Sequence, residues 1–251
     1  MIAGKLCPGP FSISPARADG SFRLMIELFQ ITGSTSFAVR CALEEIGAEY
    51  IAIDIAPRDR GHPPEFAKVN PNRSVPALRD GEAEVYETGA CLLYLAERFP
   101  EAGLAPPLGD PSRGSYLRWL VWLADTFRPL WERIMAPFFF TTESQPGVRA
   151  RGFEDLERVG AFLEQELAGR TWCVGERYTV ADTYLYMLVG WQHYKPEFVV
   201  GGDAVQAHYA RVGARPAIAR ARELDDLDER LLRHHPELRG GVRVDAPVVD
   251  L

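Results

Sequence analysis

The sequence predicts an α/β half followed by an all-helical half, and three observations support this prediction. Up to about residue 100, short apolar strands alternate with amphipathic helices in the order βαβ and then ββα. A stretch rich in proline and glycine, PEAGLAPPLGDP at 100–111, then interrupts both patterns. Beyond it the strand pattern disappears and one helical pattern follows another. We therefore expect two domains joined by a linker.

The elements of the first half follow from the spacing of their apolar residues. A helix fits 36–47, because apolar residues recur at i, i+3, i+4 and i+7 from Val39 to Ile46 and a glycine ends the pattern. The run at 49–55 alternates and is rich in β-branched residues, which is typical of a strand. The predicted elements are strands at 25–30 and 49–55, a helix at 36–47, a short helix or turn at 63–70, a hairpin around Gly81 and a helix at 89–99.

The second half is predicted to be a series of helices. An aromatic-rich helix is expected first, with a bend near Pro129 because proline lacks the N–H that a helix interior needs. The predicted helices are at 112–134, 148–167, 179–194 and 215–233. The predicted divisions of the chain are a mobile extension at 1–24, an α/β domain at 25–100, a linker at 101–111, a helical domain at 112–228 and an irregular tail at 229–251.

Composition and charge exclude several classes of protein. The chain has 251 residues, of which 47% are apolar and 25% charged, as is ordinary for a globular protein. Its net charge is −7 and it has no basic block, so no nucleic-acid partner is expected. No apolar run approaches the ~18 residues that cross a membrane. The four cysteines are scattered without metal-ligand spacing, which predicts a cytoplasmic protein with buried, reduced thiols and no metal.

Three stretches resemble the cytosolic glutathione transferase family, in the family's order and spacing. They are NPNRSVPAL at 70–78, YETGACLLYLAERFP at 86–100 and WCVGERYTVADTYLY at 172–186. The run GSTSFAVRCAL at 33–43 is similar to the beta and zeta branches, which makes the resemblance bacterial in type. The resemblance implies a thioredoxin-like N-terminal domain followed by an all-helical C-terminal domain. It also implies a homodimer that acts on glutathione and a small electrophile.

The resemblance assigns a glutathione site to the two ends of the hairpin. It implies that the peptide bond between Val75 and Pro76 is cis, so that Val75 can pair with the cysteinyl part of glutathione as an added strand would. Thr88 is predicted at a helix N-terminus, where N–H groups favour a carboxylate, and it suits the γ-glutamyl carboxylate. Glu87 suits the ammonium of the same group. Arg73 is a candidate for the glycyl carboxylate, although a solvated surface arginine fits it nearly as well.

Thiolate activation is assigned to the loop TGSTSF at 32–37. A thiol with a pKa of about 8.5 is only a few per cent ionised near neutral pH, so a donor must stabilise the anion. The catalytic candidates are Ser34 and Thr35, followed by Ser36. The sequence departs from the family here: Thr35 stands where beta and zeta relatives have cysteine, which excludes a mixed disulfide at this position. Gly33 stands where some relatives have the catalytic serine. The alternative is that these hydroxyls only cap the following helix.

Other landmarks are interpreted as mainly structural. Thr179 and Asp182 have the spacing of a capping box. The aromatic residues of 116–131 are expected to pack between helices, whereas MAPFFF at 135–140 is either an apolar lid or a buried helix end. Arg128 resembles a basic residue that beta-type relatives direct toward the active site, where it could steady an anionic leaving group or acceptor.

The expected function is therefore a glutathione transferase. Three alternatives stay open: a zeta-like isomerase of the maleylacetoacetate type, a glutathione-dependent reductase or ether-cleaving lyase, and a glutathione-binding scaffold without catalysis. The apolar helical residues that would form the electrophile pocket do not name the electrophile.

Overall fold

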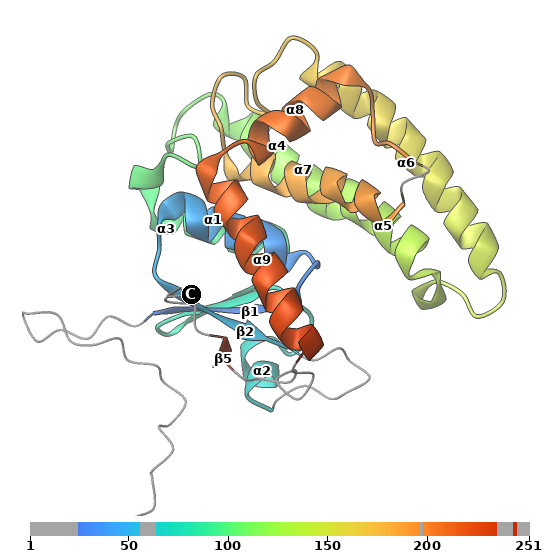
Figure 1. The fold of residues 1–251 in the computed structure, drawn as a ribbon. Coiled ribbons are helices and arrows are strands. Elements are labelled where there is room, and N and C mark those ends of the chain that lie inside the picture. The colour runs from blue at the N-terminus through green and yellow to red at the C-terminus, as the bar shows by residue number, and fades with distance from the viewer. Residues whose placement is uncertain (1–24, 56–63, 196–197, 235–242, 245–251) are drawn as a thin grey trace, which may run out of the picture.

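The computed structural model describes residues 25–55, 64–195, 198–234 and 243–244. Figure 1 shows a twisted sheet at one end of the molecule and a layer of helices stacked over it. The predicted division into an α/β half and a helical half is confirmed, and the first half has the thioredoxin-like order βαβ and then ββα.

The sheet is mixed and has the order β4-β3-β1-β2-β5. Strand β1 pairs in parallel with β2 and antiparallel with β3, and β3 forms the predicted hairpin with β4. The elements of this half are β1 (Ile26–Gln30), α1 (Ser36–Ile46), β2 (Tyr50–Asp54), α2 (Pro64–Val69), β3 (Ala77–Asp80), β4 (Ala83–Tyr86) and α3 (Thr88–Arg98).

Alternation along the central strands explains why helices cover both faces of the sheet. Ile26 and Leu28 pack into the core shared with α1 and α3, whereas Phe29 faces the other way and packs with Phe66 of α2. Every residue of β1 and of β2 is buried, as two covered faces require. Gly47 ends α1 in the left-handed region at φ 67°, as its position in the sequence predicts.

The helical half begins after the short 3-10 turn Pro100–Ala102. Its α-helices are α4 (Arg113–Trp122), α5 (Arg128–Met135), α6 (Gln145–Leu167), α7 (Val180–Gly190), α8 (Asp203–Gly213) and α9 (Pro216–His234). Short 3-10 turns at Pro137–Phe139 and Trp191–Tyr194 follow α5 and α7. The capping box of α7 is confirmed. The Thr179 side chain accepts from the backbone at Asp182, and the Asp182 side chain accepts from the backbone N–H of Thr179.

Pro129 is accommodated by a π-helical segment, Leu123–Phe127, that joins α4 to α5. The N–H of Arg128 bonds to the carbonyl of Leu123, five residues back, so the helix widens just before the proline that cannot donate. The predicted aromatic helix is therefore continuous from α4 to α5, and its hydrogen-bond pattern changes from α to π between them.

The prediction of an irregular tail at 229–251 is wrong in two places. Helix α9 continues to His234, which agrees with the helix predicted at 215–233 and places 229–234 in that helix and not in the tail. Residues Arg243–Val244 form strand β5, which pairs antiparallel with β2. Without β5, strand β2 would be a sheet edge with unpaired backbone groups. The sequence did not indicate β5, because a strand of two residues is too short to show a period. The predicted mobile extension at 1–24 lies outside the described residues.

The two halves share one continuous core. Buried residues of β1, α1 and α3 pack in the same cluster as those of α4 to α7. Arg215, just before α9, forms a bidentate ion pair with Glu45 of α1, with nitrogen–oxygen distances of 2.5 and 2.8 Å. Figure 1 shows α9 descending along α1 toward the sheet. Among the described helices, none has both the length and the apolarity that crossing a bilayer demands.

Candidate functional site

A cleft of about 1180 Å³ opens between the loops of the sheet domain and the helices α4 and α5. One wall comes from the first half and the other from the second. The wall from the sheet domain contains Ile31, Thr35, Arg73, Ser74, Val75, Glu87, Thr88, Gly89, Ala90 and Leu93. The cleft therefore collects residues from all three loops that the sequence singled out.

The loop before β3 presents a backbone edge to the cleft. The peptide bond between Val75 and Pro76 is cis, as the family resemblance implied. Asn70 is fully buried and holds this loop with two hydrogen bonds. Its Nδ2 donates to the carbonyl of Ser74 at 2.6 Å, and its Oδ1 accepts from the N–H of Asn72 at 3.0 Å. Arg73 is exposed at the rim of the cleft with φ 54°.

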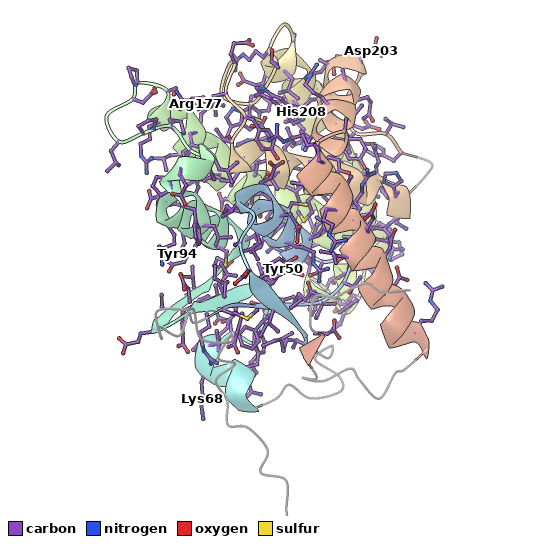
Figure 2. The ribbon with its side chains drawn as sticks, turned by 60° about the vertical axis from the view of Figure 1, so that its left-hand side comes forward. Tyr50, Lys68, Tyr94, Arg177, Asp203 and His208 are labelled. Carbon is purple, nitrogen blue, oxygen red and sulfur yellow. The ribbon has the colours of Figure 1, made fainter. Side chains whose placement is uncertain are left out.

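The turn between β4 and α3 forms the second part of the same wall. Thr88 is the first residue of α3 and is buried, whereas Glu87 precedes it, is exposed and has φ 70°. A non-glycine residue with positive φ is strained, and such residues cluster at ligand sites. Figure 2 labels Tyr94 of α3. Its hydroxyl donates to Asp80 of the hairpin at 3.0 Å, which holds helix and hairpin together.

The three hydroxyls of the loop before α1 point to different places. Thr35 lines the cleft, and its Oγ1 donates to the carbonyl of Val75 at 3.2 Å. Ser36 is 1% exposed and exchanges hydrogen bonds with the backbone of Ile31. Ser34 bonds to the Ser36 hydroxyl at 2.6 Å and accepts from the N–H of Ser36. Neither serine is among the residues that line the cleft, so the structure brings only Thr35 together with Val75, Glu87 and Thr88.

The opposite wall of the cleft is mostly apolar, with a few charges. It contains Leu117, Leu120, Val121, Ala124, Asp125, Arg128, Glu132, Phe138, Phe139 and Tyr184. Arg128 lines the cleft as expected, and its guanidinium pairs with Glu132 at 2.7 Å. Phe138 and Phe139 are 57% and 62% exposed, which contradicts a buried helix end and agrees with an apolar rim. The predicted packing role of Tyr116, Trp119, Phe127 and Trp131 is confirmed, because all four are fully buried.

The sequence did not single out three polar residues of this wall. Asp125 and Glu132 belong to helices whose pattern indicates packing only. Tyr184 has the spacing of the buried stripe of α7, and nothing in that spacing distinguishes a residue that also reaches the cleft.

Cysteine chemistry is not offered by the described thiols. Cys41, Cys91 and Cys173 are all buried, as predicted, and burial raises the pKa of each thiol. A thiol held neutral and shielded from solvent is a poor nucleophile. Among the residues that the structure describes, no cysteine is therefore placed to act as the attacking thiolate.

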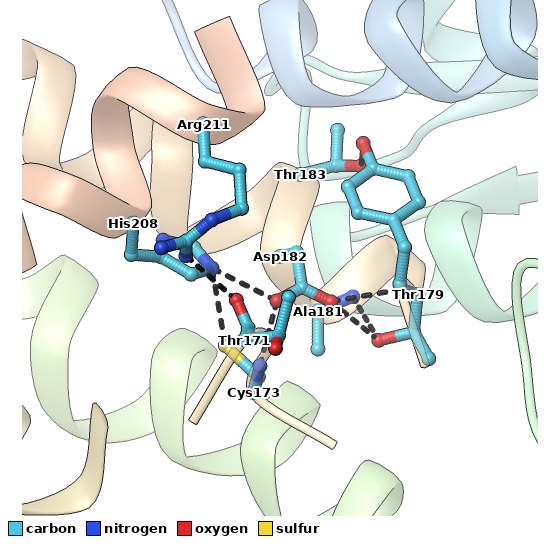
Figure 3. A network of polar contacts seen from close by, with 9 residues as sticks. Thr171, Cys173, Thr179, Ala181, Asp182, Thr183, His208 and Arg211 are labelled. Carbon is cyan, nitrogen blue, oxygen red and sulfur yellow. Dashed lines mark hydrogen bonds and ion pairs between the residues drawn. The ribbon is translucent and has the colours of Figure 1, made fainter. Parts of the chain in front are cut away.

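One buried cluster among the described residues has the types of side chain that metals bind. Ligand atoms of Cys173, Asp182 and His208 lie within 4.8 Å of one another in the helical half (Figures 2 and 3). The Asp182 carboxylate, however, accepts from the N–H of Cys173 at 2.7 Å, from His208 Nε2 at 2.9 Å and from the N–H of Thr179 at 2.8 Å. These bonds use the carboxylate to hold the start of α7, which assigns the cluster to the helix cap.

The architecture defines a thioredoxin-like domain that is followed by a helical domain, with a cleft at their junction. Models of the glutathione S-transferase N-terminal and C-terminal domains match residues 25–97 and 128–216. The chain belongs to the glutathione S-transferase family.

Its relatives carry more than one activity. Glutathione S-transferase GstA of Escherichia coli O157:H7 is 26% identical over 205 residues, which cover 80% of this chain and 100% of the relative. The disulfide-bond oxidoreductase YghU of Escherichia coli K12 is 30% identical over 234 residues, with 84% and 80% covered. A sphingomonad glutathione S-transferase complexed with glutathione is 33% identical, with a TM-score of 0.67, and 80% and 99% of the chains are covered.

Proposed function

We propose that the protein is a glutathione transferase that binds glutathione in the cleft and uses its thiolate to attack a small electrophile. One observation carries the proposal: a backbone edge at Val75, a helix N-terminus at Thr88 and a hydroxyl at Thr35 line the same wall. An extended peptide with a carboxylate at each end and a thiol in the middle needs these three features.

Each part of glutathione has a matching group on this wall. The N–H and C=O of Val75 pair with the cysteinyl residue as in strand addition. The N–H groups and hydroxyl at the start of α3 bind the γ-glutamyl carboxylate, and the exposed Glu87 binds the neighbouring ammonium. Arg73 reaches the glycyl carboxylate from the rim.

Thr35 is the proposed activating residue, and its single proton explains how activation follows binding. A threonine hydroxyl has one proton to donate, and in the free protein Thr35 donates it to the carbonyl of Val75. When the cysteinyl N–H of glutathione donates to that carbonyl, the Thr35 hydroxyl can turn its one proton from the carbonyl to the sulfur. A donor that prefers the thiolate lowers the thiol pKa.

The reaction is then a nucleophilic displacement or addition. The thiol proton leaves to solvent and the thiolate sulfur forms a bond to the electrophilic carbon. In a displacement a leaving group departs with the electron pair of its bond. In an addition the electron pair of the double bond moves onto the acceptor, which takes up a proton from solvent. The guanidinium of Arg128 lies in the same cleft and can balance negative charge on the leaving group or acceptor. Leu120, Ala124 and the exposed Phe138 and Phe139 favour an apolar or aromatic electrophile.

A screen of acceptors tests this proposal. Purified protein and glutathione would be offered an aryl halide, maleylacetone, a hydroperoxide and a low-molecular-weight disulfide. Conjugation of the aryl halide supports the transferase, and isomerisation of maleylacetone without net consumption of glutathione would replace it with the isomerase. Calorimetry that detects no glutathione binding would refute both the transferase and the isomerase. Binding without turnover of any acceptor would favour a glutathione-binding scaffold without catalysis.

Disulfide reduction is the second candidate, because a disulfide-bond oxidoreductase is 30% identical to this chain. The described cysteines are buried, so glutathione itself would supply both electrons. One thiolate attacks the disulfide and releases the first thiol, and a second thiolate attacks the mixed disulfide to give oxidised glutathione and the second thiol. A cleft of about 1180 Å³ exceeds the ~300–1,000 Å³ of ordinary ligand pockets, which suits two such ligands.

A further inference from the structure

Tyr184 of α7 is buried in the wall of the cleft, and its hydroxyl has no hydrogen-bond partner among the described residues. The oxygen of that hydroxyl is also shielded from solvent. A buried hydroxyl without a partner is costly, so a protein that keeps one in a cleft has reason to partner it in another state.

The surroundings of the Tyr184 hydroxyl belong to the proposed glutathione site. Thr88 and Glu87 line the same cleft as Tyr184, together with Arg128 and Glu132. Helix α7 packs against α3, which begins at Thr88. The Tyr184 hydroxyl forms no hydrogen bond with Thr88. Burial raises the pKa of Tyr184, so the phenol keeps its proton and remains a donor at neutral pH.

We propose that Tyr184 is a positioning residue for the γ-glutamyl carboxylate and that it acts through Thr88. When the carboxylate is bound, the Tyr184 hydroxyl donates to Thr88 Oγ1. Thr88 then accepts from Tyr184 and has its only proton committed to the carboxylate. This inference rests on the proposed glutathione binding and adds to it a residue that sequence spacing places in the core.

The two hydrogen bonds, from Tyr184 to Thr88 and from Thr88 to the carboxylate, form a relay. Counting donors and acceptors supports its direction. A carboxylate can only accept, so Thr88 must donate to it, which leaves the lone pairs of Oγ1 open to a donor. Tyr184 is a phenol whose own oxygen is shielded and therefore bonds the ligand less readily than the Thr88 hydroxyl does. Hydrogen bonds in a chain polarise one another, which strengthens the bond to the ligand.

The test compares Tyr184→Phe with Tyr116→Phe. Tyr116 is also fully buried, and its hydroxyl also lacks a hydrogen bond to any described residue, but it does not line the cleft. Removing either hydroxyl should leave the melting temperature of the ligand-free protein unchanged or higher, because an unpartnered polar group is lost. Only Tyr184→Phe should weaken glutathione binding, by roughly three- to tenfold in Kd, which is the loss of about one hydrogen bond.

Ligand analogues locate the effect. The Tyr184→Phe penalty should disappear with 4-aminobutyryl-cysteinyl-glycine, which lacks only the γ-glutamyl carboxylate, and should persist with glutathione amidated at its glycine. It should also disappear in a Thr88→Ala background, where the relay is already broken.

The outcomes separate this inference from the proposed function. Glutathione binding to the unmodified protein with an unchanged Kd in Tyr184→Phe overturns the relay and leaves the proposed function intact. A loss of melting temperature that parallels the loss of affinity, or an equal penalty with both analogues, also overturns it. Failure of the unmodified protein to bind glutathione overturns the proposed function, and the relay with it.

Discussion

At the scale of single residues, orientation separates hydroxyls that the sequence presents as equivalents. Ser34, Thr35 and Ser36 are neighbours, and each would serve as a helix cap or as a donor to sulfur. In the structure the two serines bond each other and the backbone of Ile31, and Thr35 alone faces the cleft. The order of preference among the three can thus be sharpened to Thr35.

Replacing Thr35 with Ala should return the pKa of bound glutathione toward ~8.5 and lower the rate at neutral pH about ten- to a hundredfold. Binding should change much less, because Val75, Glu87 and Thr88 hold the peptide. Ultraviolet titration of the bound thiolate measures the pKa. Ser34→Ala is the matched control, and glutathione bound to it should have the same thiol pKa as in the unmodified protein. Identical pKa values in all variants would mean that the hydroxyls of this loop do not activate the thiol and only cap α1.

Replacing Thr88 with Ala should weaken glutathione binding by about 1.5–3 kcal/mol, because one charge-assisted hydrogen bond to the carboxylate is lost. This is roughly one to two decades in Kd, which isothermal calorimetry resolves. Thr88→Ser retains the hydroxyl and should bind nearly as well. An unchanged Kd in Thr88→Ala would move the carboxylate away from the start of α3.

What the sequence predicted at this scale depended on recognisable local motifs. The cis bond before Pro76 and the pair of Glu87 and Thr88 follow from stretches that resemble a known family. The positive φ of Glu87 and the hydrogen bond from Asn70 to Ser74 were not predicted, although both lie inside these stretches, because a motif does not record backbone angles or hydrogen-bond partners. Tyr184 has an apolar spacing, and only its three-dimensional neighbours connect it with the cleft.

At the scale of elements, α7 starts from a buried and fully bonded cap. Asp182→Ala should lower the free energy of unfolding by about 3 kcal/mol, because it leaves the buried N–H groups of Cys173 and Thr179 without an acceptor. Chemical denaturation measures this loss. Glu157→Ala, on the exposed face of α6, is the control and should change stability by about 0.5 kcal/mol or less. A loss as small for Asp182→Ala would contradict the capping role.

Helix α8 is capped from another helix, which gives stability a pH dependence. Glu164 of α6 accepts from the N–H groups of Ala204, Gly202 and Val205, and these bonds lower the pKa of its carboxyl. A lowered pKa stabilises the fold above the unfolded-state value of about 4.3, and the contribution is lost as pH falls through the lower, folded value.

Glu164→Ala should therefore cost about 1 kcal/mol near pH 7, and the difference from the unmodified protein should shrink at roughly pH 3. Denaturant titrations at the two pH values measure it. Glu164→Gln does not titrate and accepts through one oxygen, so it should fall between the two proteins near pH 7. A constant difference between Glu164→Ala and the unmodified protein would show that the ionised carboxylate does not cap α8.

Elements with a strong period were predicted well, and those defined by contact were not. The period of 3.6 in α1 and the alternation of β2 are properties of the local sequence. The π segment depends on how the helix accommodates Pro129, which has no N–H to donate. The pairing of β5 with β2 depends on which segment reaches the unpaired edge of the sheet. Neither leaves a period in the local sequence.

At the scale of the whole molecule, the halves are joined by a common core and by the ion pair of Arg215 with Glu45. The sequence predicted the two domains and their order from the break in pattern at 100–111. It did not predict that Arg243–Val244 pairs with β2 of the first half, because pairing between segments so distant in the sequence depends on the packed fold.

Part of the cleft wall, on the helices α3 and α4, is an exposed apolar surface. Val121 is 66% exposed and Leu117 is 39% exposed, and both lie near Ala90 and Leu93 on the cleft lining. One helix belongs to each half. The family resemblance implies a two-fold dimer in which the first domain of one subunit contacts the helical domain of the other, and this surface combines both partners of such a contact.

We propose that this surface is the dimer interface, so that sedimentation should give a mass near twice the 28.0 kDa of one chain. Val121→Arg should shift the protein toward monomer, because two-fold symmetry brings the same surface of both subunits together and buries the added charge of each without a partner. Val199→Arg is the matched control, since Val199 is a similarly exposed valine, at 58%, outside α3 and α4, and its mass should stay that of the dimer. If the unmodified protein sediments as a single chain at micromolar concentration, or if both variants dissociate alike, the apolar surface of α3 and α4 does not join two subunits.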